Sequence, residues 1–333
     1  MNNKIKSKKT TGFMKSNYIR AFLKKYKFNY LLGVISLIVV DIAQTRVPII
    51  VGSVIDQIES KNFHMTLISS VIIKLVSISI AIYIGRIAWR FFIFGTGRSI
   101  EKDIRNDMFL HLEKMSSRYF QDNTPGEIMA YMTNDLEAVR MALGPGILFL
   151  IDVLAMGTIT LYSMIVQIDP LLTLAGVVPL LLIAVSVRIM GRENRKRFRN
   201  KQEAFAELSK FVQEQLTGIK VIKSFVQEEK TIDAFERNVK RTYEKNMHLI
   251  KIQSLMHPFM QFISGLALAV AIGYGGYITI KQRITLGDFT AFIQYLSMLV
   301  WPMVATGMTI NIFASGAASL ERVESILNEP VEI

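Results

Sequence analysis

Residues 188–251 read RIMGRENRKRFRNKQEAFAELSKFVQEQLTGIKVIKSFVQEEKTIDAFERNVKRTYEKNMHLIK, and this stretch decides the fold. It begins with a dense run of cations that directly follows an apolar segment. Apolar residues then recur at steps of three and four in two series: Phe205, Leu208, Val212 and Leu216, then Ile232, Phe235, Val239, Tyr243, Met247 and Ile250. This spacing predicts two amphipathic helices. The apolar and basic turn between them, Gly218 to Phe225, is the part that we expect to contact another protein.

Composition places the chain in a membrane. Of its 333 residues 51% are hydrophobic, and the mean hydropathy of +0.33 is too high for an ordinary soluble domain. The net charge is +12, but the cations alternate with membrane-length apolar runs, which argues against nucleic acid as a partner. The chain has no cysteine and only four scattered histidines, so we expect no disulfide, no catalytic thiol and no metal site.

Six apolar runs have about the 20 residues that a helix needs to cross a bilayer. They are 28–50, 66–92, 141–168, 171–190, 258–280 and 289–313. Two long connections between them are rich in Lys and Arg, and three short ones are poor in both. Since cations near the ends of spans stay in the cytoplasm, we expect both termini and both long loops to be cytoplasmic. The predicted fold is an all-α membrane protein with six transmembrane helices and two long helical cytoplasmic extensions.

The residues before the first run carry nine cations and no acid. Residues 1–17 are predicted to be a basic disordered tail without a signal peptide. Residues 18–27 alternate apolar and basic side chains, which favours an interfacial elbow helix in the headgroup region; the alternative is a continuation of the basic tail.

The first long loop repeats the plan of residues 188–251. Apolar residues at helical spacing form one descending and one ascending series: Ile100, Ile104, Met108, Leu112 and Met115, then Ile128, Met132, Leu136 and Val139. Thr124, Pro125 and Glu127 predict a capping box that starts the second helix. Arms of about 17–20 residues would extend roughly 25–30 Å from the membrane.

No segment matches Gly-x-x-x-x-Gly-Lys-Ser/Thr, and no catalytic triad is recognisable, so we expect no catalytic site in this chain. Ionisable residues within spans usually face protein or water. For Asp41 and Asp152 the sequence leaves two alternatives, pairing with a cation of another span or contact with a transported solute. Arg86 is expected to extend toward the cytoplasmic membrane surface. The candidates for a substrate pathway are Asp41, Gln44, Asp152, Gln294, Met298 and Met303.

Four motifs carry a family resemblance. They are Tyr119-Phe120 with 124–129 and Thr133-Asn134-Asp135; residues 215–225; Leu286-Gly287-Asp288-Phe289 with Trp301-Pro302-Met303; and residues 318–323. Together they resemble the transmembrane domain of type I ATP-binding cassette (ABC) exporters, most closely one subunit of a bacterial heterodimeric multidrug exporter. The resemblance extends from about Tyr18 to the end. It implies a transmembrane domain at 28–320, and residues 321–333 as the start of a linker to a nucleotide-binding domain in a longer chain or on a separate one.

The resemblance also implies how the protein works. Two coupling helices would seat in nucleotide-binding domains, the second on the partner's: Arg118, Tyr119, Phe120, Gln121 and Asn123, then Thr217, Gly218, Ile219, Lys220, Val221 and Phe225. ATP and Mg²⁺ would bind those domains and not this chain. The chain would pair with a second exporter half, and a heterodimer is favoured over a homodimer. Together the two halves would export amphipathic drugs, lipids or peptides across a bacterial cell membrane. The alternative function is an ATP-independent carrier or scaffold that binds a cytoplasmic partner through the same loops.

Overall fold

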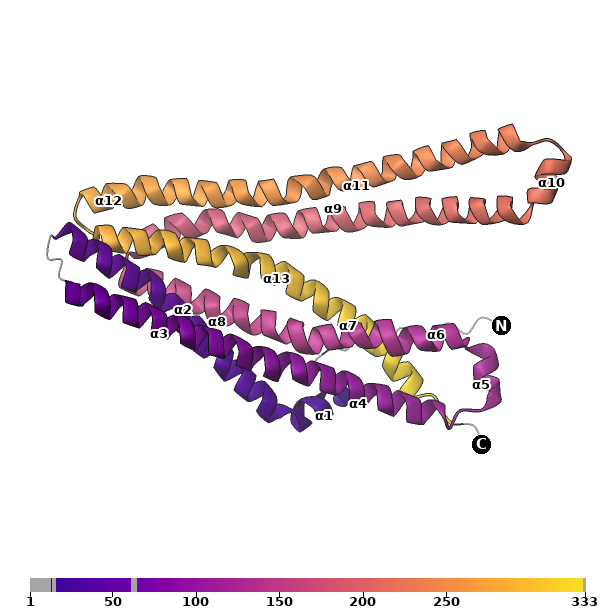
Figure 1. The fold of residues 1–333 in the computed structure, drawn as a ribbon, viewed down its shortest axis with the longest axis horizontal. Coiled ribbons are helices and arrows are strands. Elements are labelled where there is room, and N and C mark those ends of the chain that lie inside the picture. Colours follow the sequence, from indigo (N-terminus) through magenta and orange to yellow (C-terminus); the bar gives the residue numbers. More distant parts are fainter. Residues whose placement is uncertain (1–12, 14–15, 61–64, 332–333) are drawn as a thin grey trace. The chain divides into compact units, whose positions relative to one another are not determined.

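The computed structural model describes residue 13, residues 16–60 and residues 65–331, so most of the predicted basic tail lies outside the described residues. These residues form helices and their connections, with no strand among them. Contacts divide the chain into two compact units, Met1–Ala175 with Ala271–Ile333, and Gly176–Val270. We describe each unit by itself (Figure 1).

The first unit contains most of the helices. In chain order they are α1 (Asn17–Lys25), α2 (Lys27–Glu59), α3 (Met65–Trp89), α4 (Gly95–Leu112), α5 (Ser117–Asp122), α6 (Pro125–Ala130), α7 (Leu136–Met141), α8 (Ile147–Gln167), α12 (Gly276–Ile280) and α13 (Leu286–Leu327). Short π-helical turns join several of them end to end: η2 (Arg90–Phe94), η3 (Tyr131–Asp135), η4 (Ala142–Gly146) and η5 (Ala271–Gly275).

The second unit is a helical hairpin. Its two long helices are α9 (Pro170–Thr217), which begins in the first unit, and α11 (Glu228–Val270), and the short α10 (Ile219–Ser224) joins them at the far end (Figure 1). At 1.5 Å per residue, the 48 residues of α9 extend over about 72 Å, more than twice the roughly 30 Å of a bilayer's hydrocarbon core. The second half of α9 therefore lies beyond any membrane that its first half crosses.

The described residues include six helical segments that are long and apolar enough to cross a membrane, and the six predicted runs fall on them. The segments are Lys27–Glu59, Ser69–Leu112, Pro125–Gln167, Pro170–Thr217, Glu228–Ile280 and Leu286–Leu327. Many of their large apolar side chains are exposed, such as Ile73, Ile80 and Tyr83 of α3. Exposed apolar surface on this scale is expected where lipid is the solvent, so the chain is a multi-pass membrane protein.

The main apolar core of the first unit lies at the end of the bundle nearest α5. The predicted series of the first long loop is confirmed here, because Ile100, Ile104, Met108 and Leu136 are completely buried. Val323 of α13 packs into the same core. The predicted capping box is also present: the Thr124 hydroxyl accepts from the Glu127 amide (3.3 Å), and the Glu127 carboxylate accepts from the Thr124 amide (3.2 Å).

The apolar series of the hairpin have a different outcome. Their spacing is helical as predicted, but Phe205, Leu216, Ile232, Phe235 and Tyr243 are exposed. The cause is that the two helices alone offer no third layer against which these side chains can be buried. Within its own unit the hairpin therefore leaves these apolar side chains exposed.

A close junction joins the end of α2 to the start of α13. The Asp56 carboxylate accepts from the Gly287 amide (2.7 Å) and from the Thr285 hydroxyl (2.8 Å), which caps the first turn of α13. A Cβ atom added to Gly52 would lie 2.6 Å from the Gly287 carbonyl oxygen, and one added to Gly287 would meet Asp56 and the Gly52 carbonyl. The two helices can approach this closely because both Gly52 and Gly287 lack a Cβ atom.

We predict that Gly287→Ala lowers the melting temperature of the purified protein. The added methyl group has no space and must separate α2 from α13, at a cost of about 1–3 kcal/mol. Gly157→Ala in α8 is the matched control, since a Cβ there meets nothing within 4 Å. Equal melting temperatures for the two variants would contradict the junction described here.

Candidate functional site

The first candidate tip is α5, which connects the two arms of the first long loop (Figure 1). Its side chains differ in exposure: Arg118, Phe120 and Gln121 are exposed, whereas Tyr119 is half-buried against the apolar core. The side-chain amide of Asn123 donates to the Tyr119 carbonyl (3.0 Å) and closes the helix, and α6 begins directly afterwards. The predicted residues of the first tip thus lie together on a short helix that is fixed to a packed core.

The end of α13 lies close to this tip. A ring nitrogen of His111, at the end of α4, is 3.1 Å from the Glu329 carbonyl oxygen. Burial raises the pKa of Tyr119, and the negative charge of Glu329 adds to the effect. The C-terminal end of α13 therefore lies beside the first tip.

An ion pair braces the same region. Two guanidinium nitrogens of Arg322 (α13) contact the two oxygens of Asp135 (η3) at 2.8 and 2.5 Å, and the Ser319 hydroxyl donates to Asp135 at 2.9 Å. The Asp135 residue is only 9% exposed, and the Arg322 guanidinium holds the pKa of this carboxyl below its usual range. Paired, two-point contacts of this kind fix orientation as well as distance. The brace therefore holds the ascending arm of the first loop against α13.

The second candidate tip is α10. No residue of this helix is buried, and the predicted residues Ile219 and Val221 are exposed. Phe225, which ends the helix, is 70% exposed. The chain then reverses at Val226, which has φ of 52°, a left-handed conformation that β-branched residues rarely adopt. The second tip thus presents apolar side chains beside Lys220 and Lys223, with no covering element in the described chain.

The predicted pathway residues lie on the helices of the first unit, and three of them share one charged neighbour. Asp41 of α2 is 3% exposed. Arg86 of α3 donates to the Gln44 side chain (3.2 Å) and lies within electrostatic range of Asp41 and of Asp152 on α8. Arg86 thus lies near both aspartates, but no ion pair within 4.0 Å joins it to either one among the described residues, and both alternatives for Asp41 and Asp152 stay predictions. The extension of Arg86 toward the cytoplasmic membrane surface also stays a prediction.

The other pathway candidates do not join this cluster. Gln294, Met298 and Met303 are half-buried along α13. Trp301 of the same helix, which sequence reasoning did not select as a site residue, packs edge-on against Phe149 of α8, with ring centroids 6.2 Å apart. In the described ranges no three His, Cys, Asp or Glu side chains are grouped closely enough to hold a metal ion.

We predict that Asp135→Asn lowers stability by about 1–2 kcal/mol, because the neutral amide loses the charge of a largely buried contact. The folded-state pKa of Asp135 is depressed, so its contribution is complete above the ordinary carboxyl pKa of about 4 and is lost as pH falls through the lower folded value. The melting-temperature gap between wild type and variant should therefore be constant from pH 8 to about pH 5 and shrink below pH 4. Glu137→Gln, which removes an exposed carboxylate, should show no such gap.

Comparison with known proteins identifies relatives over most of the chain. The family model described as "ABC transporter transmembrane region" matches residues 30–303. A multidrug resistance-like ATP-binding protein, MdlA of Buchnera aphidicola, is 34% identical over 312 residues, which are 94% of this chain and 54% of that protein. The probable multidrug resistance ABC transporter ATP-binding/permease protein YheI of Bacillus subtilis is 33% identical over 94% of this chain and 53% of its own length. MdlA of Escherichia coli is 32% identical over 90% of this chain and 51% of its own.

This chain spans about half the length of the curated relatives that it matches.

Proposed function

Because this chain belongs to the ABC transporter transmembrane region family, we propose that it is the membrane-spanning half of an ATP-driven exporter. The observation that carries the proposal is the pair of tips, α5 and α10, at the ends of helices that continue from membrane-length apolar segments. Each tip presents an exposed aromatic side chain, Phe120 or Phe225, beside cations. Such tips suit contact with the surface of a second protein domain.

In this proposal ATP is bound and hydrolysed by that second domain. The relatives are named as ATP-binding proteins and extend well beyond the matched segment. ATP and Mg²⁺ would be held there, and the contribution of this chain is mechanical. A packed helical arm changes position as a rigid body because its interior is close-packed, so movement of a tip is transmitted toward the bilayer.

The two tips differ in how they are supported. The first is fixed to a buried core by Tyr119 and is braced through Asp135 and Arg322. The second is supported by α9 and α11 alone within its unit. We propose that movement of a nucleotide-binding domain is transmitted by the first tip to the helical bundle of this chain. The second tip would transmit such movement along α9 and α11.

A second exporter half is the proposed partner of the hairpin. The exposed apolar residues Phe205, Leu216, Phe235 and Tyr243 are not covered within the hairpin's own unit, and exposed apolar patches of this kind mark contact surfaces. The family resemblance favours a heterodimer, in which the partner half has a different sequence, over a homodimer. The solute would be amphipathic, and the polar cluster of Asp41, Gln44 and Asp152 would line its pathway.

The proposed location is a bacterial cell membrane, with both termini and both tips in the cytoplasm. The excess of Lys and Arg in the two long loops supports this orientation, since cations near the ends of spans remain on the cytoplasmic side. Membrane lipid is then a further partner of the exposed apolar surface.

We predict that Phe225→Ala, introduced into the complete exporter, lowers dye transport about tenfold while insertion into the membrane is unchanged. Removing a ring that is buried only at the domain contact costs about 1.5–3 kcal/mol of that contact. The measurement is transport per ATP hydrolysed in proteoliposomes. Tyr83→Ala, which removes an exposed aromatic ring from α3 away from both tips, is the control and should keep this ratio. Normal transport by Phe225→Ala would contradict the coupling role of α10.

A further inference from the structure

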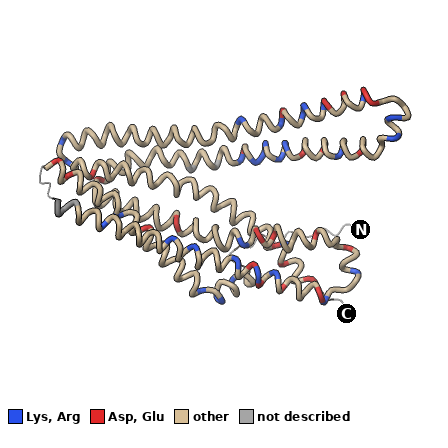
Figure 2. The backbone as a smooth tube through the Cα atoms, viewed as in Figure 1, with Lys and Arg blue, Asp and Glu red and all other residues tan. Residues whose placement is uncertain are grey.

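A pocket lies between α9 and α11 at the level where the surface of the hairpin changes character. Helix α9 carries no Lys, Arg, Asp or Glu before Arg188 and α11 carries none after Lys251, so the charged residues of the hairpin lie on the side nearer α10 (Figure 2). On α9, Ile189 (63% exposed) lies one helical turn before Glu193 of the pocket, on the same face. On α11, Leu255 (64% exposed) lies two turns after His248. The pocket is therefore at the boundary between a lipid-facing and a water-facing surface.

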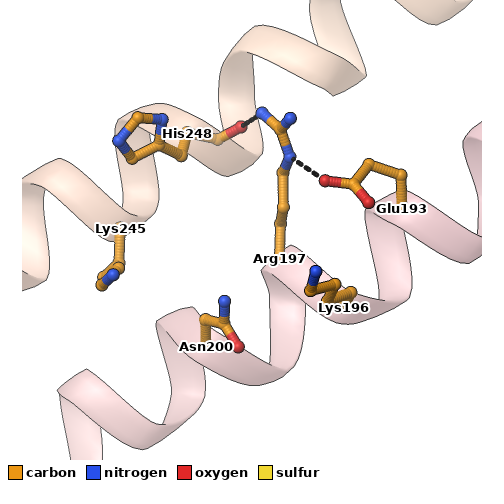
Figure 3. Close-up of a pocket in the computed structure, with 6 residues that line it drawn as sticks. All are labelled: Glu193, Lys196, Arg197, Asn200, Lys245 and His248. Carbon is orange, nitrogen blue, oxygen red and sulfur yellow. Dashed lines mark hydrogen bonds and ion pairs between the residues drawn. The ribbon is translucent and has the colours of Figure 1, made fainter.

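The pocket is basic. Figure 3 shows the residues that line it: Glu193, Lys196, Arg197 and Asn200 from α9, with Lys245 and His248 from α11. Three permanent cations thus face one carboxylate, and His248 and the Asn200 amide supply further donor capacity. The excess positive charge selects for an anion.

Arg197 and Glu193 neutralise each other and shape the pocket. The Arg197 Nε atom donates to the Glu193 carboxylate (2.8 Å), and its Nη1 atom donates to the backbone carbonyl of His248 on the opposite helix (2.7 Å; Figure 3). Arg197 therefore bridges the two helices. It also lowers the pKa of Glu193, with a smaller contribution from Lys196, so this carboxylate remains charged and paired.

The two lysines remain available. Across the described part of the chain, neither Lys196 nor Lys245 forms an ion pair within 4.0 Å. One comes from each helix, so a ligand with several acceptor oxygens can be contacted from both sides. A phosphate group has this form, and ammonium groups bind it as point charges.

We propose that this pocket binds the phosphate of an anionic phospholipid headgroup. Basic pockets between spanning helices on the cytoplasmic side bind such headgroups. The flanking Ile189 and Leu255 offer apolar surface to the acyl chains, which a free phosphate ion would not use. The inference goes beyond the proposed function, because it assigns a bound lipid that need not be transported, and it requires only that α9 and α11 cross the membrane.

The test uses the complete exporter, purified and titrated with phosphatidylglycerol or phosphatidylcholine, with bound lipid counted by native mass spectrometry. Phosphatidylglycerol should be retained in preference to phosphatidylcholine. The double variant Lys196→Gln/Lys245→Gln should bind phosphatidylglycerol at least about tenfold more weakly, as expected for two lost cations near a membrane surface. Lys196→Arg/Lys245→Arg should restore binding, which separates a lost charge from a misfolded hairpin.

The control double variant is Lys230→Gln/Lys240→Gln, which removes the same charge from exposed positions of α11 outside the pocket. It should change the affinity less than twofold. If both double variants weakened phosphatidylglycerol binding equally, the lipid would be attracted by the overall positive charge and not by this pocket, and the proposal would be overturned. Unchanged binding in both variants would also overturn it. Displacement of phosphatidylglycerol by millimolar inorganic phosphate would overturn it as well, by assigning the pocket to a soluble anion. ATP hydrolysis and transport need not be measured, so the result is independent of the proposed exporter function.

Discussion

Backbone hydrogen bonding in a bilayer is the constraint on which this structure depends. Lipid offers no donor or acceptor, so a spanning segment must satisfy its own amides and carbonyls, and the α-helix does so within one segment. Once a helix has formed, each further residue is added at little cost. The spans can therefore continue into water as the same helices, and α9 and α11 do so over many turns. The long helical arms therefore use the same backbone hydrogen bonding that the membrane requires of the spans.

The ends of those arms are built differently, and the difference is physical. The arms that carry α5 pack against α13 and bury most of their apolar series, including Ile104 and Leu136. The arms that carry α10 form a hairpin with exposed apolar residues on its surface. The hairpin is crossed by individual polar contacts, such as Arg197 with His248 and Arg241 with Glu207, and buries few apolar side chains, among them Ala204 and Leu249. Its secondary structure is complete and its apolar packing is not, which is the basis for proposing a second protein as its cover.

Local patterns predicted those parts of the structure that local physics determines. Helical spacing was enough for the buried series from Ile100 to Val139, and the order Thr124, Pro125, Glu127 was enough for the start of α6. The contact of Asp135 with Arg322 joins residues 187 positions apart, and no periodicity relates them. The left-handed conformation at Val226 could not be predicted from the sequence, because the residue is not a glycine. The roles of the two tips in coupling stay predictions, because the contacts that would show them are contacts with another protein domain.

Helix α13 is fixed near both of its ends. Asp56 holds its first turn and Asp135 binds Arg322 near its last, and the about 35 residues of helix from Gly287 to Arg322 span about 53 Å of axis. Pro302 falls inside this length, where the missing backbone donor makes the helix easier to bend. With both ends held, a bend at Pro302 would change the angle between the two halves of α13.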